Sequence, residues 1–165
     1  DNFPEEFNKW SPNCKYDKGV KSDSLYINGY DNTILYTDYL LNSMIDSLEK
    51  QEAIAAVWYV SDHGQTITAT QGWHGSVCDE NEYHVPLCIW YSDEYKHYNK
   101  NAIKQLGNHI HTPINSDNIF YTICGMTHIE LPESYAHVEW DISSEKFEVH
   151  PRKIIVAGQI RNLDE

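Results

Sequence analysis

The chain has little positive charge for its length. Its 165 residues include 12 Lys and Arg against 25 Asp and Glu, which gives a formal net charge of −13 with the histidines neutral. No run of basic residues is longer than Arg152-Lys153. The phosphate groups of nucleic acids and anionic membranes would repel such a surface, so we expect no nucleic-acid partner. If the protein handles phosphate, a group other than Lys and Arg must supply the positive charge.

Long apolar runs are also missing. The longest stretches without a charged residue have the length of a buried strand, whereas a helix that crosses a bilayer needs roughly 20 apolar residues. The first seven residues contain neither the basic region nor the apolar core of a signal peptide. Two alternatives stay open on these grounds: a cytosolic chain, or a chain whose targeting part has been removed.

The few cysteines show no Cys-x-x-Cys spacing of the kind that zinc modules use. They are Cys14, Cys78, Cys88 and Cys124. Cys88 lies in an apolar run that resembles a strand, and Cys124 lies in a segment that resembles a helix. We therefore predict buried free thiols at these two positions.

Apolar residues are nevertheless plentiful enough for a folded core, at 41% of the chain. Residues 1–30 show no sustained period and are predicted to be irregular surface chain. Asp31 is a plausible N-cap for a helix that extends to about Lys50, with apolar side chains at three- and four-residue steps. Residues 54–60 follow as a continuous apolar run of strand length.

Three further elements are predicted towards the C-terminus. Residues 85–91 form a second apolar run, residues 118–124 a short helix that Asp117 caps and Gly125 ends, and residues 153–157 a late edge strand. A long helix followed by a strand that is buried on both faces is typical of a parallel sheet in an α/β protein.

The candidate chemistry lies where the first strand ends. Asp62 and His63 follow residues 54–60, at the end of a strand where open α/β sheets bind their ligands. Adjacent side chains reach one ion only in a turn, which Gly64 permits. A carboxylate beside an imidazole suits Zn²⁺ better than Ca²⁺. His74 lies in a loop between two glycines and can fold back over the same site. The alternative is a helix-capping Asp62 beside a surface histidine.

Several short motifs follow one another along the chain. They are Tyr30-Asp31-Asn32-Thr33, Ser61-Asp62-His63-Gly64, Trp73-His74-Gly75, His84-Val85-Pro86 and Asp117-Asn118-Ile119-Phe120. Their order, from about Glu5 to Ala157, resembles the phosphoethanolamine transferases, the membrane-anchored enzymes of the alkaline phosphatase and sulfatase superfamily that modify lipid A.

The resemblance implies an alkaline-phosphatase and sulfatase-like three-layer sandwich, in which a mostly parallel sheet is flanked by helices. It implies that Asp62 and His63 bind the catalytic zinc, and that His74 is a catalytic residue beside the transferred phosphoryl group or binds a second metal ion. It also implies transfer of phosphoethanolamine from phosphatidylethanolamine to lipid A or another envelope glycan. The catalytic domain of such an enzyme faces the periplasm from the inner membrane.

The chain also departs from that family. Gln65 stands where the family has glutamate, and Cys14 lacks the usual partner cysteine nearby, which leaves it free or bonded elsewhere, with Cys78 the only loop candidate. The family's nucleophilic threonine, a glutamate ligand and another histidine belong to an upstream region. We therefore expect residues 1–165 to be the C-terminal portion of a larger domain that membrane helices precede, and to be inactive alone. Two alternatives are a phospho- or sulfo-ester hydrolase of the same superfamily, and a non-catalytic remnant.

Overall fold

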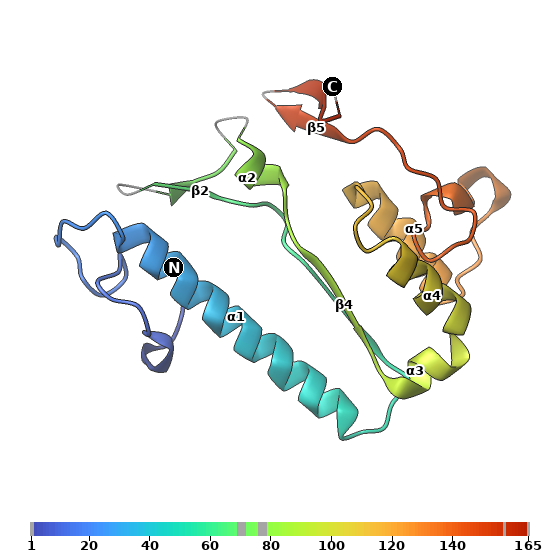
Figure 1. Ribbon diagram of the computed structural model, residues 1–165, viewed down its shortest axis with the longest axis horizontal. Helices are drawn as coiled ribbons and strands as arrows, with labels where there is room; N and C mark the ends of the chain where they lie inside the picture. The colour runs from blue at the N-terminus through green and yellow to red at the C-terminus, as the bar shows by residue number, and fades with distance from the viewer. Residues whose placement is uncertain (1, 69–71, 76–78, 157, 165) are drawn as a thin grey trace. The chain divides into compact units, whose positions relative to one another are not determined.

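The computed structural model describes residues 2–68, 72–75, 79–156 and 158–164, and divides into two compact units, Asp1–Ser92 and Asp93–Glu165. The elements of the first unit are η1 (Glu5–Phe7), α1 (Leu25–Glu49), β1 (Ala56–Val60), β2 (Thr66–Ile67), β3 (Gly72–Trp73), α2 (Glu80–Tyr83) and β4 (Leu87–Tyr91) (Figure 1). Those of the second unit are α3 (Asp93–Tyr98), α4 (Lys100–Asn108), α5 (Ser116–Met126), η2 (Glu133–Tyr135), η3 (Val138–Trp140), β5 (Lys153–Val156) and β6 (Gln159–Asn162).

Helix α1 begins at Leu25 with Ser24 as its N-cap, seven residues before the predicted cap Asp31, and ends at Glu49 as predicted to within one residue. Its first turns hold the N-terminal segment. The fully buried Asn32 accepts hydrogen bonds from the backbone N–H groups of Lys9 and Trp10 at 2.9 and 3.0 Å, and its amide donates to the Trp10 carbonyl at 2.8 Å. The amide of Asn28 donates to the Pro12 carbonyl. These tertiary hydrogen bonds stabilise the helical conformation of a segment whose residues have a low helix propensity of their own.

Strands β1 and β4 pair along their whole length, with Ala56 opposite Tyr91 and Val60 opposite Leu87 (Figure 1). The pairing is antiparallel, so the parallel arrangement predicted for these two runs is wrong. Two wholly apolar runs carry no information about their relative direction, which is set by the connection that turns the chain back. That connection contains β2, β3 and α2, and it therefore lies at the end of the pair where β1 stops and β4 starts.

Burial of β1 and β4 is also lower than predicted. Their side chains are half-buried for the most part, and both Val60 and Cys88 are exposed. The expectation of a buried Cys88 thiol is therefore wrong, because the strand face that carries it has no covering layer within the described residues. Phe3 is the one buried apolar side chain among the described residues of the first unit.

The second unit has a core of its own, formed by Tyr95, Ile103, Cys124, Met126 and Ile142. The Tyr95 hydroxyl donates to the Met126 carbonyl at 2.5 Å, which joins α3 to the end of α5. Cys124 is a buried free thiol, as predicted.

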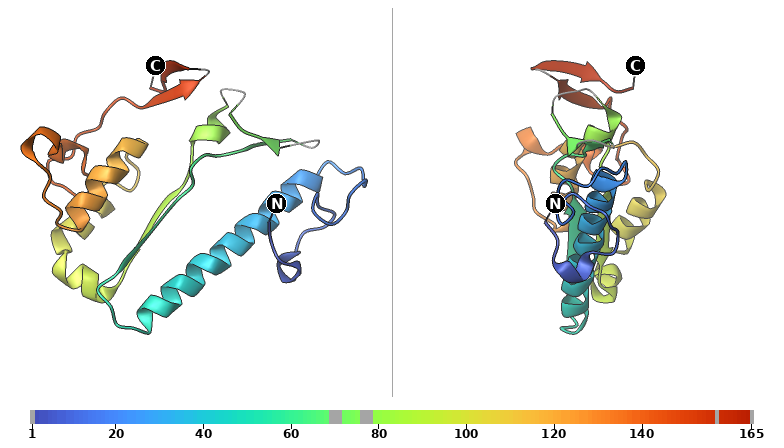
Figure 2. Two further views of the ribbon diagram at one scale, coloured as in Figure 1. Left: turned by 180° about the vertical axis from the view of Figure 1, so that it is seen from behind. Right: turned by 90° about the vertical axis from the view of Figure 1, so that its left-hand side faces the viewer.

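The predicted helix around residues 118–124 is present as α5 but is longer, and its cap is Asn115 in a capping box with Asn118, not Asp117. The predicted late strand is confirmed over Lys153–Val156, where β5 pairs with β6 in an antiparallel hairpin (Figure 2). Ala157, the last residue predicted for this strand, lies outside the described residues.

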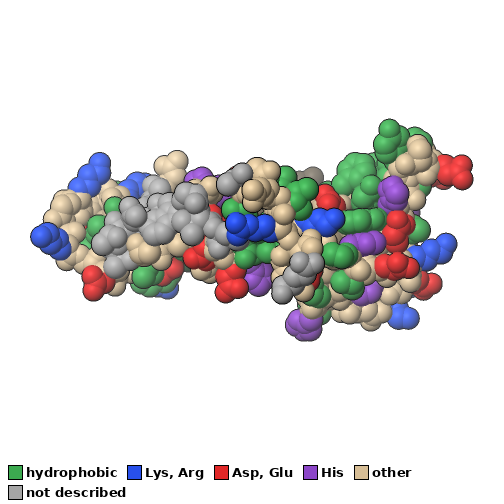
Figure 3. All heavy atoms as spheres, turned by 90° about the horizontal axis from the view of Figure 1, so that it is seen from above, with side chains coloured by type: hydrophobic (Ala, Val, Ile, Leu, Met, Phe, Trp, Pro, Cys, Tyr) green, Lys and Arg blue, Asp and Glu red, His purple; other side chains and the backbone are tan. Residues whose placement is uncertain are grey.

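The distribution of basic side chains on the surface can be compared with the low positive charge of the sequence. On the face that Figure 3 shows, Lys and Arg side chains lie singly between acidic, histidine and apolar side chains. No helix within the described ranges is both long enough and apolar enough to cross a membrane.

Candidate functional site

Asp62 and His63 lie in a tight turn directly after β1. The Ser61 hydroxyl donates to the His63 carbonyl at 2.6 Å, and the His63 backbone N–H donates to Asp62 Oδ1 at 3.1 Å. The next residue, Gly64, donates its backbone N–H to the Glu82 carbonyl at 2.7 Å. The turn brings the neighbouring Asp62 and His63 side chains together, which an extended strand would not do.

The hydrogen bonds of His63 define which of its nitrogens is available. Nδ1 lies 2.7 Å from the Gly64 carbonyl oxygen, which only accepts, so Nδ1 carries the proton in the neutral ring. Nε2 then presents a lone pair 3.8 Å from Asp62 Oδ2. Two ligands of one tetrahedral zinc ion are separated by about 3.4 Å, given zinc–ligand bonds of about 2.0–2.1 Å. The donor set therefore suits zinc, and the separation of these two atoms exceeds the tetrahedral value by about 0.4 Å.

The same two side chains are accessible. The Asp62 side chain is 89% exposed and the His63 side chain 45% exposed. A carbonyl that orients the far nitrogen of a ligating histidine is a recurrent feature of metal sites. Among the described residues, however, no group of three or more His, Cys, Asp and Glu side chains is arranged to hold a metal ion. Asp62 and His63 would thus form part of a metal centre.

His74 lies next to His63, as its position between two glycines predicted. The two imidazole rings are stacked, with centroids 4.0 Å apart and planes inclined by 20°. The structure therefore brings together the three residues that the sequence singled out: Asp62, His63 and His74.

Glu82 was not singled out from the sequence. Its side chain is only 9% exposed and accepts hydrogen bonds from Gly75 N–H at 2.8 Å and from the Thr66 hydroxyl at 3.3 Å. The sequence does contain a pattern at this position, because Asp79 caps α2 and Glu82 stands three residues later, as in a capping box. A capping box predicts that the Glu82 carboxylate bonds to the backbone of Asp79. It does not predict the observed bond to the loop that contains His74.

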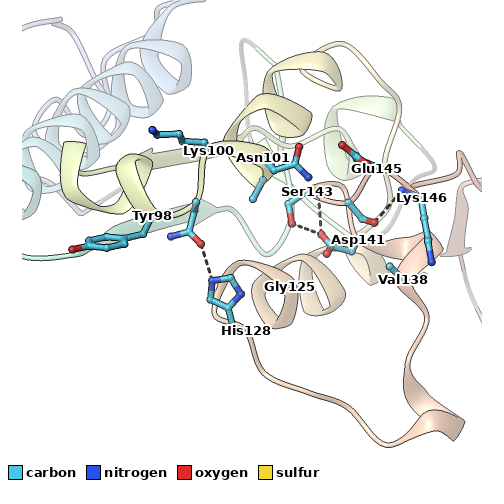
Figure 4. A pocket seen from close by; sticks show the side chains of 13 residues that line it. Tyr98, Lys100, Asn101, Gly125, His128, Val138, Asp141, Ser143, Glu145 and Lys146 are labelled. Carbon is cyan, nitrogen blue, oxygen red and sulfur yellow. Dashed lines mark hydrogen bonds between the residues drawn. The ribbon is translucent and has the colours of Figure 1, made fainter.

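A second group of polar residues lines a hollow of about 440 Å³ in the second unit (Figure 4). Its buried groups have protein partners. Asp141 Oδ1 accepts from the Ser143 backbone N–H at 2.8 Å and from its hydroxyl at 2.6 Å. The Asn99 amide donates to the Tyr95 carbonyl at 3.0 Å, and its oxygen accepts from His128 Nε2 at 2.8 Å. Burial raises the pKa of the Asp141 carboxyl above its usual range, against the opposing effect of the Ser143 hydrogen bonds.

The two regions therefore differ in what they offer a ligand. The buried polar side chains at the hollow are bonded to the protein, whereas the turn after β1 presents a carboxylate and an imidazole to solvent. The turn therefore places an Asp-His pair at the end of a strand, which is where open α/β sheets bind their ligands.

Comparison with known proteins places the chain within a family. A sequence profile of the Sulfatase family matches residues 1–129. The chain belongs to this family, which confirms the resemblance drawn from its motifs and implies an alkaline-phosphatase-like α/β fold. No solved structure matches it.

Curated relatives carry transferase names. The chain is 34% identical over 104 residues to the Kdo(2)-lipid A phosphoethanolamine 7''-transferase of Escherichia coli, which covers 61% of this chain and 18% of that relative. It is 34% identical over 128 residues to the phosphoethanolamine transferase EptA of Helicobacter pylori, covering 74% and 23% respectively. For EptA of Salmonella typhimurium the identity is 30% over 136 residues, covering 78% and 25%. The chain thus spans a quarter or less of the length of these relatives.

Proposed function

We propose that this chain is part of a metal-dependent phosphoethanolamine transferase, in which Asp62 and His63 are zinc ligands and His74 is a catalytic residue. The donor is phosphatidylethanolamine, and the acceptor is lipid A or another envelope glycan. The names of the relatives support the reaction, and the family supports its metal dependence.

The observation that carries the proposal is the spacing of 3.8 Å between His63 Nε2 and Asp62 Oδ2. In the neutral ring, with the proton on Nδ1 beside the Gly64 carbonyl, Nε2 can act as a ligand next to the exposed Asp62 carboxylate. A shared cation would give both atoms a partner. It also supplies the positive charge that this acidic chain does not draw from Lys and Arg.

Zinc, when bound, acts as a Lewis acid that favours ionisation of a hydroxyl nucleophile and stabilises charge on phosphoryl oxygens. The chain's own residues have simpler tasks. Asp62 and His63 hold the ion at the end of β1. His74, stacked on His63, is placed beside the phosphoryl group, where its imidazole can donate a hydrogen bond to a non-bridging oxygen or assist the leaving group.

The remaining parts of the active site come from outside this chain in our proposal. The nucleophilic threonine, a glutamate ligand and a further histidine are supplied by an upstream region, which also anchors the protein in the inner membrane and completes a three-layer sandwich with a mostly parallel sheet. Large side chains left exposed on α1 support such a covering layer. They are Ile27, Ile34, Tyr39, Leu40 and Met44. The catalytic domain then faces the periplasm.

A phospho- or sulfo-ester hydrolase of the same superfamily is the second candidate function. Gln65, which stands where the resemblance implies glutamate, favours a changed or lost activity. Transfer and hydrolysis differ in the fate of the phosphoryl group, which an acceptor takes up in one case and water in the other.

The experiment uses the full-length polypeptide and four variants. Asp62→Asn and His63→Ala are expected to lose bound zinc, measured by elemental analysis, together with transfer from fluorescent phosphatidylethanolamine to lipid A. His74→Ala is expected to keep the zinc and lose the transfer. His111→Ala, which alters an exposed histidine of the second unit, serves as the control. Full zinc content in Asp62→Asn and His63→Ala would contradict the assigned ligands, and release of headgroup without transfer would favour the hydrolase.

A further inference from the structure

Glu82 connects the two segments that contain the histidines of the candidate site. Its backbone carbonyl accepts from Gly64, the residue after His63, at 2.7 Å. Its side-chain Oε2 accepts from Gly75, the residue after His74, at 2.8 Å. One residue of α2 thus bonds to the backbone directly after each histidine.

The contact on the His63 side is a close one between backbones. A Cβ atom placed on Gly64 would lie 1.8 Å from the carbonyl oxygen of Asn81, the residue before Glu82. Glycine is therefore needed here for the approach of the chain to α2. The turn that presents His63 rests on the backbone of α2 and cannot shift away from it without breaking the bond to Glu82.

The contact on the His74 side depends on the Glu82 carboxylate. Oε1 accepts from the Thr66 hydroxyl of β2 at 3.3 Å, while Oε2 holds Gly75 just beyond β3. Hydrogen bonds that backbone N–H groups donate to a carboxylate are shorter and stronger than those between neutral groups. A buried carboxylate without such partners would be costly, so the bonds to Thr66 and Gly75 also fix the position of Glu82 itself.

Helix α2 is held in place from its other end. Asp79 Oδ1 accepts from the backbone N–H of Asn81 at 2.9 Å and from its amide at 2.7 Å. The Glu82 backbone N–H donates to the Asp79 carbonyl at 2.9 Å. The single helical turn therefore has bonds of its own that do not involve the Glu82 carboxylate, and it provides a fixed base for both histidine segments.

We propose that Glu82 is a positioning residue that keeps the His63 and His74 rings in contact. The stacking of the rings at 4.0 Å is the result that its bonds to both segments produce. Its importance for catalysis rests on the proposed function, whereas its effect on the ring contact does not. Outer groups that orient metal ligands are worth about 10–100-fold in metal affinity.

The test compares three substitutions in α2 of the full-length protein. Glu82→Met keeps the length of the side chain but removes both acceptors. Glu82→Gln keeps an oxygen for Gly75 and an amide that can donate to Thr66, so it is the conservative variant. Glu80→Met alters an exposed glutamate of the same helix and is the matched control.

Two measurements are made on each variant. The first is the dipolar contact between the His63 and His74 rings in isotope-labelled, metal-free protein, observed by magic-angle-spinning NMR. The second is zinc affinity, by competition with a chelator. Glu82→Met is expected to lose the ring contact and to bind zinc about 10–100-fold more weakly, and Glu82→Gln and Glu80→Met to retain both.

The outcomes separate this inference from the function on which it builds. A ring contact that persists in Glu82→Met, or one that is lost equally in Glu82→Gln, overturns the role of Glu82. Loss of the contact in Glu82→Met alone, in a protein whose unaltered form binds no zinc, supports the positioning role and contradicts the metal site.

Discussion

The turn after β1 and the turn at Asp141 are built from the same kinds of residue but differ in exposure. Each has an aspartate that bonds to backbone nearby, a histidine within the same unit and a glycine packed against a fixed group. The Asp62 side chain is 89% exposed, whereas Asp141 is only 9% exposed. The oxygen lone pairs of Asp62 are therefore accessible to a ligand. Those of Asp141 are buried, and its carboxylate would have to give up hydrogen bonds to the protein in order to bind one.

The histidines follow the same division. His63 keeps Nε2 open because the Gly64 carbonyl binds its other nitrogen, while His128 uses Nε2 to bind the buried oxygen of Asn99. His128 also occupies a left-handed backbone conformation with φ of 56°, at the end of α5. The comparison teaches that residue type alone does not mark a ligand site. A side chain is available to a ligand when the fold has left it with few hydrogen-bond partners in the protein.

The largest effect is expected from Gly64→Ala, which tests whether the turn after β1 needs its close approach to α2. The new Cβ would lie 1.8 Å from the Asn81 carbonyl oxygen, and backbone cannot rotate away as a flexible side chain can. We expect loss of the His63–His74 ring contact and a fall in unfolding free energy of about 1–3 kcal/mol, by analogy with overpacked cores. Denaturant unfolding and the NMR ring contact measure the two effects.

Gly107→Ala is the matched control, because a Cβ there meets no atom within 4 Å and Ala is favoured over Gly in helix α4 by about 1 kcal/mol. Equal behaviour of the two variants would contradict the packing described for Gly64.

An intermediate effect is expected from Gly125→Ala in the second unit. Its Cβ would lie 2.0 Å from Asp141 Oδ2, which is the end of a side chain and not backbone. Asp141 is nevertheless held by Ser143, so relief of the contact requires breaking those bonds. The helix preference for Ala of about 1 kcal/mol offsets part of the cost. We expect a net loss of about 1 kcal/mol in unfolding free energy.

A double-mutant cycle separates the two contributions. With Asp141→Ala in place, Gly125→Ala is expected to become stabilising, which gives a coupling free energy of about 0.5–3 kcal/mol. Additive effects of the two substitutions would mean that the contact between Gly125 and Asp141 is absent in solution.

The elements were predictable where local pattern and tertiary environment agree. The apolar runs gave β1 and β4 to within two residues, and the periodic face gave the end of α1. The start of α1 was missed because Asn28 and Gly29 indicate loop, whereas bonds from Asn28 and Asn32 to the N-terminal segment stabilise helix there. The direction of β1 against β4 depends on their connection, which the composition of the strands does not encode.

The site was predictable in part for the same reason. The proximity of Asp62, His63 and His74 was predictable because strand ends and glycine-flanked loops are visible in sequence. Glu82 was missed, since its role depends on where the loop before it folds back. A buried acid at a capping-box position looks identical in sequence to an exposed one.

The smallest effect is expected on the pH dependence of the unfolding free energy, through the ionisation of Asp141. Burial raises the pKa of Asp141 in the folded protein, so its contribution to stability is fully present below the usual aspartate pKa of about 3.9 and is lost as pH rises through the raised value. Asp141→Asn removes this loss. We therefore expect the variant to gain unfolding free energy relative to the unaltered protein above that range, and the gain to vanish in more acidic solution.

An exposed aspartate provides the reference for this experiment. Denaturant unfolding at several pH values, for Asp141→Asn and for Asp38→Asn on the exposed surface of α1, yields the two difference curves. Arg152 lowers the pKa of Asp164 through its hydrogen bonds, which gives a pH dependence of opposite sign, but this group is present in every variant and cancels in the difference. A flat curve for Asp141→Asn would mean that its carboxylate is as well solvated as that of Asp38. Burial would then not distinguish Asp141 from an exposed aspartate.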